Sequence, residues 1–334
     1  DGVPVISGLF GVEKPKEVPG HPGLQQLRLI CNLIPSNAYF QEIRRDIDGL
    51  PYCLQWNAVV LLDDEVLLIS QEDMSCAFYL FRLPSEWAKY FAIGRPIKLS
   101  ELHGNAKARA RSEAHCKGMS MSGIGYLCLV TLPMGWLSAT GVMQAVHRQI
   151  LVQPKGGGTP LPTAAEIRKS GVLPMGPDQR FNRGWQVYLD NFAGLSVVKA
   201  RHLEGAQREI DRWHAATREA WKVHSIPSAA DKSVSNSLQA TELGCEVLGR
   251  RGTLGTIPQR RLAAIAMSLH LIGARNPHRM WLAMDAGCWN FIFQFRRQAA
   301  CAYSAVWRLI SHWKNCSMLS IEVCPEFLTA IFLA

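Results

Sequence analysis

The pattern of apolar positions predicts strands in the first two thirds of the chain and helices toward its end. Continuous runs rich in Leu and β-branched residues predict strands at 27–34 and 125–133, the second of them buried. Two further runs at 58–70 flank Asp63-Asp64-Glu65 and predict a hairpin, because such an acidic trio is typical of a solvated turn. Residues 1–24 are rich in Gly and Pro and predict loop with short extended pieces.

Apolar residues three and four positions apart predict amphipathic helices. Residues 138–152 fit such a helix, with Ser138 as its N-cap, and the pattern from 258 onward is mainly helical. The segment 75–83 (SCAFYLFRL) is apolar enough to begin another helix. A longer helix is predicted at 199–224, ended by Pro227, and its apolar face consists of Leu203, Ala206, Ile210, Trp213, Thr217 and Ala220.

The sharpest local pattern lies at 185–198 (WQVYLDNFAGLSVV). Trp185, Val187 and Leu189 share one face of a strand. The opposite face carries Gln186, Tyr188 and Asp190. A tight turn is expected at Asp190-Asn191, because both residue types tolerate positive φ, and a second strand follows. Residues 241–250 predict one more short strand and turn.

Composition changes this picture only by exclusion. Of 334 residues, 48% are hydrophobic and 19% charged, which excludes disordered, collagen-like and low-complexity chains. The length suggests about two domains. The net charge of +9 favours a polyanionic partner only weakly, since many basic proteins bind no nucleic acid.

The cysteines and the termini bear on the cellular compartment. Ten cysteines occur without a single C-x-x-C pair, mostly in apolar surroundings, so we expect reduced, buried cysteines and neither a disulfide framework nor a zinc site. That is typical of an intracellular protein of the nucleus or cytoplasm. No signal peptide and no run of about 18 apolar residues is present, which predicts no membrane partner. A start at Asp1 without Met indicates a fragment or a processed piece.

Two aspartates are candidates for phosphoryl-transfer chemistry. Such a site needs carboxylates on rigid elements that hold two Mg²⁺ ions about 3.5–4 Å apart. Asp73 at a strand end and Asp190 at a hairpin tip would meet this need if their strands were neighbours in one sheet, which spacing alone does not establish. The simpler interpretation, a turn at Asp190-Asn191 and a helix cap at Asp73, stays open.

Other motifs carry weaker signals. Gly156-Gly157-Gly158 lacks the Gly-Lys-Ser/Thr of a phosphate loop and is typical of a flexible linker. Three basic segments could follow a phosphate backbone or form ordinary solvated surface: 105–117, 250–261 and Arg296-Arg297. The basic insertion at 103–117 and the Gly/Pro-rich insertion at 153–178 have no assigned role.

The order of several motifs resembles the fingers–palm core of reverse transcriptases of retroelements. VEKPK (12–16), with Lys14 and Lys16, is similar to the first fingers motif, and LRLICNLIPSN (27–37) is similar to the second. In the second motif a basic residue reaches the incoming triphosphate, and Arg28 falls at that position. QEDMSCAFYLF (71–81) is similar to palm motif A, with Asp73 as metal ligand and Phe78 at the steric-gate position.

The later motifs follow in the same order. LPMGWLSATGVMQ (132–144) is similar to motif B, whose Pro133-Met134-Gly135 turn would lie under the nascent base pair. VYLDNF (187–192) is similar to motif C, with Asp190 as catalytic aspartate, and Asn191 stands where a second aspartate is usual. Lys232 falls at the motif D lysine near the leaving pyrophosphate. ELGCEVLG (242–249) is similar to the primer-gripping motif E.

This resemblance implies an α+β fold: a right-hand polymerase with fingers and an antiparallel palm sheet at 1–250, followed by a helical thumb-like region at 251–334. It implies RNA-directed DNA synthesis with two Mg²⁺ or Mn²⁺ ions, dNTPs, and an RNA or DNA template with primer. Asp73, Asp190 and Asn191 would hold metal, and Lys232 would act in catalysis. The implied nucleic-acid contacts are Tyr188, Gly244, Arg250 and Arg251.

Two alternatives stay open beside this hypothesis. The chain could be a catalytically weak or inactive retroelement remnant that binds nucleic acid, which Asn191 favours. An RNA-templated RNA polymerase of the same palm type is disfavoured, because Phe78 leaves little room for a 2′-hydroxyl. The segment 287–297 (GCWNFIFQFRR) resembles the region after the polymerase core in retroelements, including those of dinoflagellate genomes.

Overall fold

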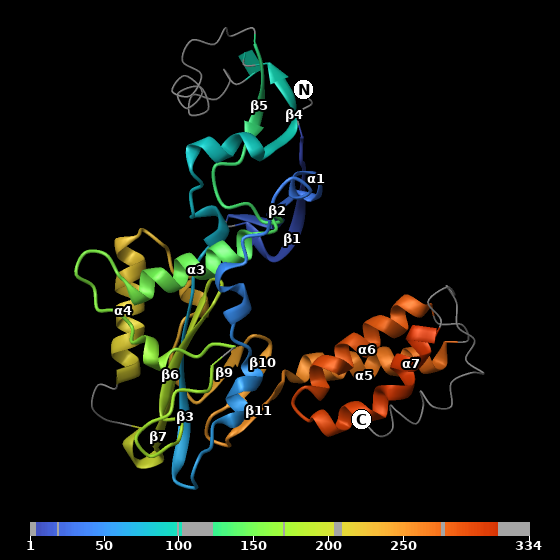
Figure 1. The fold of residues 1–334 in the computed structure, drawn as a ribbon. Helices are drawn as coiled ribbons and strands as arrows, with labels where there is room; N and C mark the ends of the chain where they lie inside the picture. The colour runs from blue at the N-terminus through green and yellow to red at the C-terminus, as the bar shows by residue number, and fades with distance from the viewer. Residues whose placement is uncertain are drawn as a thin grey trace.

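The computed structural model describes residues 5–18, 20–98, 100–101, 123–169, 171–203, 209–274 and 278–312. It is a mixed fold of helices and antiparallel sheets, as the sequence predicts (Figure 1). The predicted basic loop at 103–117 and the end of the chain after 312 lie outside the described residues.

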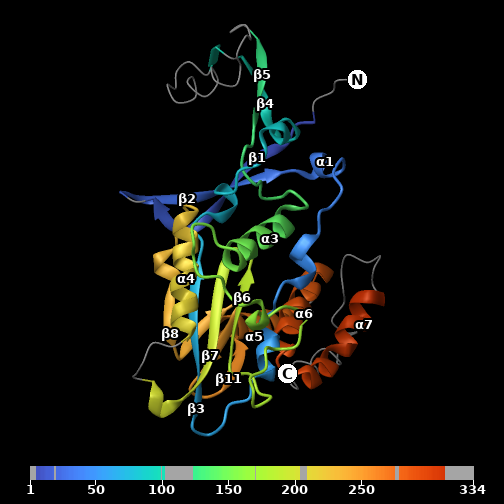
Figure 2. The same cartoon turned by 60° about the vertical axis from the view of Figure 1, so that its left-hand side comes forward.

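The centre of the molecule is a four-stranded antiparallel sheet in the order β6-β7-β3-β8 (Figures 1 and 2). Its strands are β6 (Arg183–Tyr188), β7 (Asn191–Lys199), β3 (Glu65–Asp73) and β8 (Val234–Ser237). All but the first residue of β3 are buried, which requires cover on both faces of the sheet.

Two helices, α3 (Ala139–Val152) and α4 (Glu209–Val223), cover one face of this sheet (Figure 2). Their apolar sides and the sheet enclose a cluster of large buried side chains that includes Met143, Trp185, Phe192, Trp213 and Trp221. Of the face predicted for the second helix, Ile210, Trp213, Thr217 and Ala220 are indeed buried.

The opposite face is covered by short elements. These are the 3-10 helix η2 (Cys53–Ala58) and a three-stranded sheet of β9 (Gln239–Glu242), β10 (Cys245–Leu248) and β11 (Thr253–Thr256). They share a second cluster with the sheet residues Ile69, Ala193 and Leu195. The faces are distinct because neighbouring residues of a strand point to opposite sides.

Two antiparallel ribbons and a helical region complete the described chain. The ribbons are β1 (Gly8–Val18) with β2 (His21–Asn32), and β4 (Ala92–Lys98) with β5 (Ile124–Cys128). The helices are α1 (Ile34–Asn37), α5 (Pro258–Gly273), α6 (Arg279–Phe293) and α7 (Ser304–His312), the last three sharing their own apolar cluster. Short 3-10 turns are η1 (Arg45–Gly49), η3 (Ala77–Tyr79), η4 (Ser85–Tyr90), η6 (Thr163–Ala165), η7 (Ala200–His202), η8 (Ala230–Lys232) and η9 (Arg297–Tyr303).

Several predicted elements are corrected by the tertiary structure. No hairpin forms at 58–70, because β3 pairs with β7 and β8, while the Val60 carbonyl and Leu62 N–H bond to the Arg180 and Glu65 side chains. Residues 8–18 form a long strand rather than loop. The segment 75–83 contains only η3, and the strand at 124–128 is largely exposed rather than buried.

The tight turn of the β6–β7 hairpin lies one residue earlier than predicted. Tyr188 pairs with Asn191, so Leu189 and Asp190 form the turn and Asn191 begins β7. Leu189, not Asn191, has the positive φ, at 54°. Of the long helix predicted at 199–224, the structure shows α4, while Lys199 ends β7 and residues 204–208 lie outside the described residues.

The expectation that the described cysteines are all reduced was wrong. Cys53 and Cys245, 192 residues apart in sequence, form a disulfide that joins η2 to β10. Both lie in the cover of the same sheet face, so the tertiary fold brings together residues that spacing does not relate. In the described part of the chain, no helix is long and apolar enough to cross a membrane.

The disulfide is testable by peptide mapping and unfolding. Non-reducing digestion should yield a linked peptide containing Cys53 and Cys245 that reductant separates. Cys53→Ser should lower the free energy of unfolding by about 2–5 kcal/mol, because the closed loop restricts the unfolded chain. Cys301→Ser, at an exposed free cysteine, is the matched control and should leave stability unchanged. Absence of the linked peptide would contradict the pairing.

Candidate active site

The two predicted aspartates meet at one end of the central sheet. β3 ends at Asp73, and the antiparallel register places Asp73 directly opposite Asn191 at the start of β7. Asp190 precedes Asn191 in the turn, and the Met74 N–H donates to the Asp190 carbonyl at 3.0 Å. The side-by-side strands that the two-carboxylate hypothesis requires are therefore present.

Charge at this site is only partly balanced. Burial raises the pKa of Asp190, and the nearby Asp73 carboxylate raises it further, while Lys232 and Arg28 act in the opposite direction. The Lys232 ammonium lies 2.9 Å from Asp73 Oδ2 and is itself more than half exposed. Two carboxylates thus share a region in which a bound cation would be favoured.

The loop that carries Lys232 is bonded directly to the end of β3. The Ala229 N–H donates to the Asp73 carbonyl at 2.8 Å, and the Ser75 N–H donates to the Pro227 carbonyl at 2.8 Å. Lys232 lies in η8 just beyond these contacts. Backbone pairing, rather than the ion pair alone, therefore holds the ammonium beside Asp73.

Glu72 has the opposite environment to its neighbour Asp73. Its buried carboxylate accepts hydrogen bonds from His214, Arg218, Ser228 and Ser233. Burial would raise the pKa of Glu72, but these donors lower it to about 2. The Glu72 carboxylate therefore joins β3 to α4 and to the loop at 228–233.

The turn that presents Asp190 is held from behind by helix α3. The Gln144 side chain donates to the Val187 carbonyl at 2.9 Å and accepts from the Leu189 N–H at 2.8 Å. His147 Nδ1 lies 2.7 Å from the Leu189 carbonyl, and the Trp221 indole N–H donates to His147 Nε2 at 3.2 Å. Because Nε2 accepts, Nδ1 carries the proton and donates.

Burial keeps this histidine neutral. It lowers the pKa of His147 to about 4, so the tautomer that bonds to Leu189 persists at neutral pH. Gln144 and His147 lie three residues apart on one face of α3 and together fix the positive φ of Leu189. Sequence pattern did not reveal these two supports, because their partners are backbone atoms more than 40 residues away.

The predicted Pro133-Met134-Gly135 turn packs against the end of β2. Gly135 has a φ of 102°, and a Cβ there would lie 2.5 Å from the Cys31 carbonyl oxygen, so only glycine fits. The Asn37 amide donates to the Gly135 carbonyl at 2.8 Å and accepts from the Leu137 N–H at 3.1 Å. Asn37 is a third supporting residue that the sequence pattern did not reveal.

The remaining predicted residues are spread around this centre. Arg28 is exposed on β2 and close enough to affect the pKa of Asp190, whereas Lys14 on β1 is half-buried. The side chain of Lys16 lies outside the described residues. Phe78 is half-buried against the helix-side cluster, where it packs as a core residue would.

The residues predicted to bind nucleic acid lie at the end of β6 and in the turns before and after β10. Tyr188 lines a cavity of about 360 Å³ with Leu243 and Phe291, between the β9–β10 turn and α6. Gly244 in that turn has a positive φ of 79°. Arg250 and Arg251 are exposed in the turn between β10 and β11.

The donor set suits a hard divalent cation only in part. Among the described residues, no three His, Cys, Asp or Glu side chains are grouped as a metal site. Asp73 and Asp190 supply two carboxylates, and Asn191 adds an amide oxygen, which Mg²⁺ accepts without gaining charge compensation. A cation bound by these three groups would meet one negative charge fewer than three carboxylates would provide.

Comparison with known proteins identifies the fold. No family model and no curated protein matches the sequence. A foamy viral protease-reverse transcriptase (dRH) in complex with double-stranded DNA matches 98% of this chain and 43% of its own, with a TM-score of 0.57 and 12% identity. A second double-stranded DNA complex gives 0.54 and 12% over 98% of this chain and 51% of its own.

A third structure, bound to an RNA/DNA hybrid, gives a TM-score of 0.55 and 12% identity over 98% of this chain and 33% of its own. The chain thus spans about half or less of the length of these structures. At such low identity the likeness concerns the backbone alone. The chain has a reverse-transcriptase-like fold.

The support of the turn by α3 can be measured without any substrate. Gln144→Ala should lower the free energy of unfolding by about 1–3 kcal/mol, because the buried Val187 carbonyl and Leu189 N–H lose their partner. Urea unfolding followed by tryptophan fluorescence would measure it. Gln149→Ala, exposed on the same helix, should change stability by less than about 0.5 kcal/mol. Equal effects of the two variants would contradict this role.

Proposed function

We propose that this chain is the polymerase part of an RNA-directed DNA polymerase of a retrotransposon, which adds dNTPs to a primer 3′-hydroxyl. The observation that carries the proposal is the convergence of Asp73 and Asp190 at adjacent strand ends, with Lys232 on Asp73. The reverse-transcriptase-like fold supports it. We include in this proposal a retroelement of the dinoflagellate type, because residues 287–297 resemble the region after the polymerase core in such elements.

In this proposal the four-stranded sheet is the palm, the β1–β2 and β4–β5 ribbons belong to the fingers, and α5 to α7 form the thumb. The boundary between the polymerase core and the thumb would fall near residue 250. An RNA or DNA template with primer would pass between them, contacting Tyr188, Gly244, Arg250 and Arg251. The net charge of +9 suits such a partner.

Asp73, Asp190 and the Asn191 amide would hold two Mg²⁺ or Mn²⁺ ions. When bound, the ions would lower the pKa of the primer hydroxyl and neutralise charge on the triphosphate. The raised pKa of Asp190, caused by burial and by Asp73, supports this fit, since a cation would relieve both.

The protein's own side chains would place and protonate the substrate. Arg28, with Lys14 or Lys16, would neutralise negative charge that develops on the phosphates. Lys232 would donate a proton to the leaving pyrophosphate. The Pro133-Met134-Gly135 turn would lie under the nascent base pair.

A second candidate function, nucleic-acid binding with weak or no catalysis, is favoured by one observation. The Lys232 ammonium lies 2.9 Å from Asp73 Oδ2, and Asn191 contributes no charge, so metal binding must compete with an existing ion pair. The two candidates differ in whether a primer is extended.

Primer extension distinguishes them. On a homopolymer RNA template with deoxynucleotides, in Mg²⁺ and separately in Mn²⁺, the protein should extend the primer. Asp73→Ala and Asp190→Ala should abolish extension while leaving template binding largely intact, because binding rests on many backbone contacts. Asp63→Ala, an exposed turn residue, is the control. Template binding without extension in either metal would establish the second candidate.

Asn191 offers a gain-of-function test. Asn191→Asp adds a third carboxylate beside Asp73, so we expect a lower Mg²⁺ concentration at half-maximal rate, by about tenfold for a single added charge contact. A magnesium titration of single-nucleotide addition measures it. An unchanged titration in an active variant would remove Asn191 from the metal site.

Phe78 is proposed to exclude ribonucleotides by sterics. Phe78→Val should raise ribonucleotide incorporation relative to deoxynucleotide by at least about tenfold, because the space beside the sugar 2′ position opens. Competition between rNTP and dNTP on one template measures it. Phe81→Val, a half-buried residue of the same cluster, controls for loosened packing. Unchanged sugar selectivity in an active Phe78 variant would contradict the assignment.

A further inference from the structure

Two glutamines lie one row below the candidate site on the same face of the sheet. Gln71 precedes Asp73 by two residues on β3, and Gln186 precedes Asp190 by four residues along β6 and its turn. Both glutamines pair across the sheet with Ala193 of β7. Ala193 is fully buried and belongs to the apolar cluster that the sheet shares with η2 and the β9–β10 hairpin.

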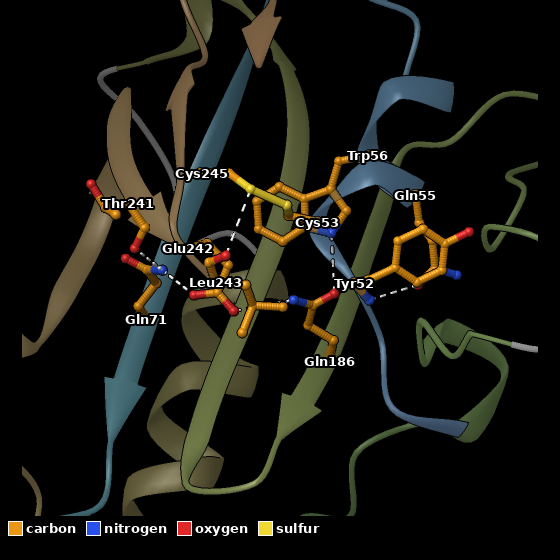
Figure 3. The surroundings of a disulfide bond; sticks show 10 residues. All are labelled: Tyr52, Cys53, Gln55, Trp56, Gln71, Gln186, Thr241, Glu242, Leu243 and Cys245. Atoms are coloured by element: carbon orange, nitrogen blue, oxygen red, sulfur yellow. Dashed lines mark hydrogen bonds between the residues drawn. A yellow bond between two sulfur atoms is a disulfide. The ribbon is translucent and has the colours of Figure 1, made fainter. Parts of the chain in front are cut away.

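Glu242 of the β9–β10 hairpin lies between these two glutamines (Figure 3). Its Oε1 accepts from Gln186 Nε2 at 3.2 Å, and its Oε2 accepts from Gln71 Nε2. The Gln71 amide also donates to the Thr241 carbonyl at 3.1 Å. The Glu242 side chain is 3% exposed, so a single buried carboxylate joins the hairpin to both strands that carry the aspartates.

Helix η2 fixes the orientation of this connection. The Trp56 indole N–H donates to Gln186 Oε1 at 3.1 Å, so the amide nitrogen of Gln186 must point toward Glu242. The Cys53–Cys245 disulfide ties the same helix to the residue that pairs with Glu242 in the hairpin (Figure 3). The Gln186 donor is thus oriented by a contact that does not involve the carboxylate.

A carboxylate is a costly choice at this position. Burial raises the pKa of Glu242 to about 7, the two amide donors lower it, and the charge of Asp73 adds to the rise. Those donors are neutral, and no basic side chain pairs with Glu242 among the interactions of the described residues. Stability alone would favour an uncharged residue. A carboxylate, however, presents a separate acceptor oxygen to each of the two amide nitrogens, which a glutamine amide cannot do.

We infer that Glu242 is a positioning residue that couples the β9–β10 hairpin to the strands carrying Asp73 and Asp190. The hairpin tip, Leu243-Gly244, follows Glu242 directly. A primer end that displaces the hairpin tip would therefore move Glu242 and, through it, Gln71 and Gln186 on the strands that lead to the aspartates. For its catalytic readout this inference rests on the proposed function, in which the tip contacts the primer.

Glu242→Gln is the first test, because it keeps the volume but turns one acceptor oxygen into a donor that faces an amide donor. We expect the maximal rate of single-nucleotide addition to fall by about 10- to 100-fold, the size of one lost charge-assisted hydrogen bond. The Kd for primer–template should stay within about twofold, and the melting temperature should be unchanged or higher, since a buried charge is removed.

Glu246→Gln is the matched control. Glu246 lies on β10 of the same hairpin and accepts from Gln239 Nε2 at 3.2 Å, at an exposed contact. This variant should keep the wild-type rate. If Glu242→Gln does not fold, Gln71→Ala removes the same interaction from the other partner. The double variant, Gln71→Ala with Glu242→Gln, should be no slower than the slower of the two single variants.

A readout without substrate separates this inference from the proposed function. In Glu242→Gln, the Met74 amide, which bonds to the Asp190 carbonyl, should exchange its hydrogen at least about tenfold faster than in wild type. If the Met74 amide exchanges faster in Glu242→Gln and the protein extends no primer, the coupling is supported and the proposed polymerase function is rejected. An unchanged exchange rate, or a rate of addition that falls only together with duplex affinity and melting temperature, would overturn the inference.

Discussion

The antiparallel register between β3 and β7 is the constraint on which the rest of the site depends. It sets Asp73 opposite Asn191 and thereby beside the turn that carries Asp190. A shift of one residue would turn Asp73 to the helix side of the sheet and Glu72 to the open end, because side chains alternate along a strand. The register is held by cover on both faces, so the chemistry at the sheet end is a consequence of packing in its centre.

Glu72 and Asp73 are adjacent on β3, but their carboxylates face opposite sides of the sheet and meet different partners. Glu72 is saturated by donors from α4 and from the loop at 228–233, and its pKa falls to about 2. Asp73, on the other face, meets one lysine and a second carboxylate whose pKa rises through burial. The Glu72 charge stabilises the joint between strand and helix, whereas the charges of Asp73 and Asp190 are balanced in part by Lys232. Both outcomes follow from which donors the tertiary structure brings to each face.

Side chains from segments distant in sequence hydrogen-bond to the elements around Asp73 and Asp190. Gln144 and His147 bond to the turn from α3, Asn37 bonds to the Gly135 turn, and Glu242 bonds to the glutamines beneath the aspartates. In each case a side chain replaces a backbone partner or joins two strands that the sheet alone would not connect. Hydrogen bonds from three separate segments thus support the strand end and its turns, an arrangement that favours fixed distances between charges.

The sequence by itself predicted the β6–β7 hairpin and the helix at 138–152, because alternation and periodicity are local signals, whereas Asp73, Asp190, Asn191 and Lys232 were singled out together by the resemblance of their motif order to reverse transcriptases. Only the tertiary structure decided that β3 pairs with β7 rather than with residues 58–64. It likewise decided that Cys53 meets Cys245 and that Glu242 accepts from Gln186. Those contacts join residues 56 to 192 positions apart, and no local pattern records which distant donor will meet a given acceptor.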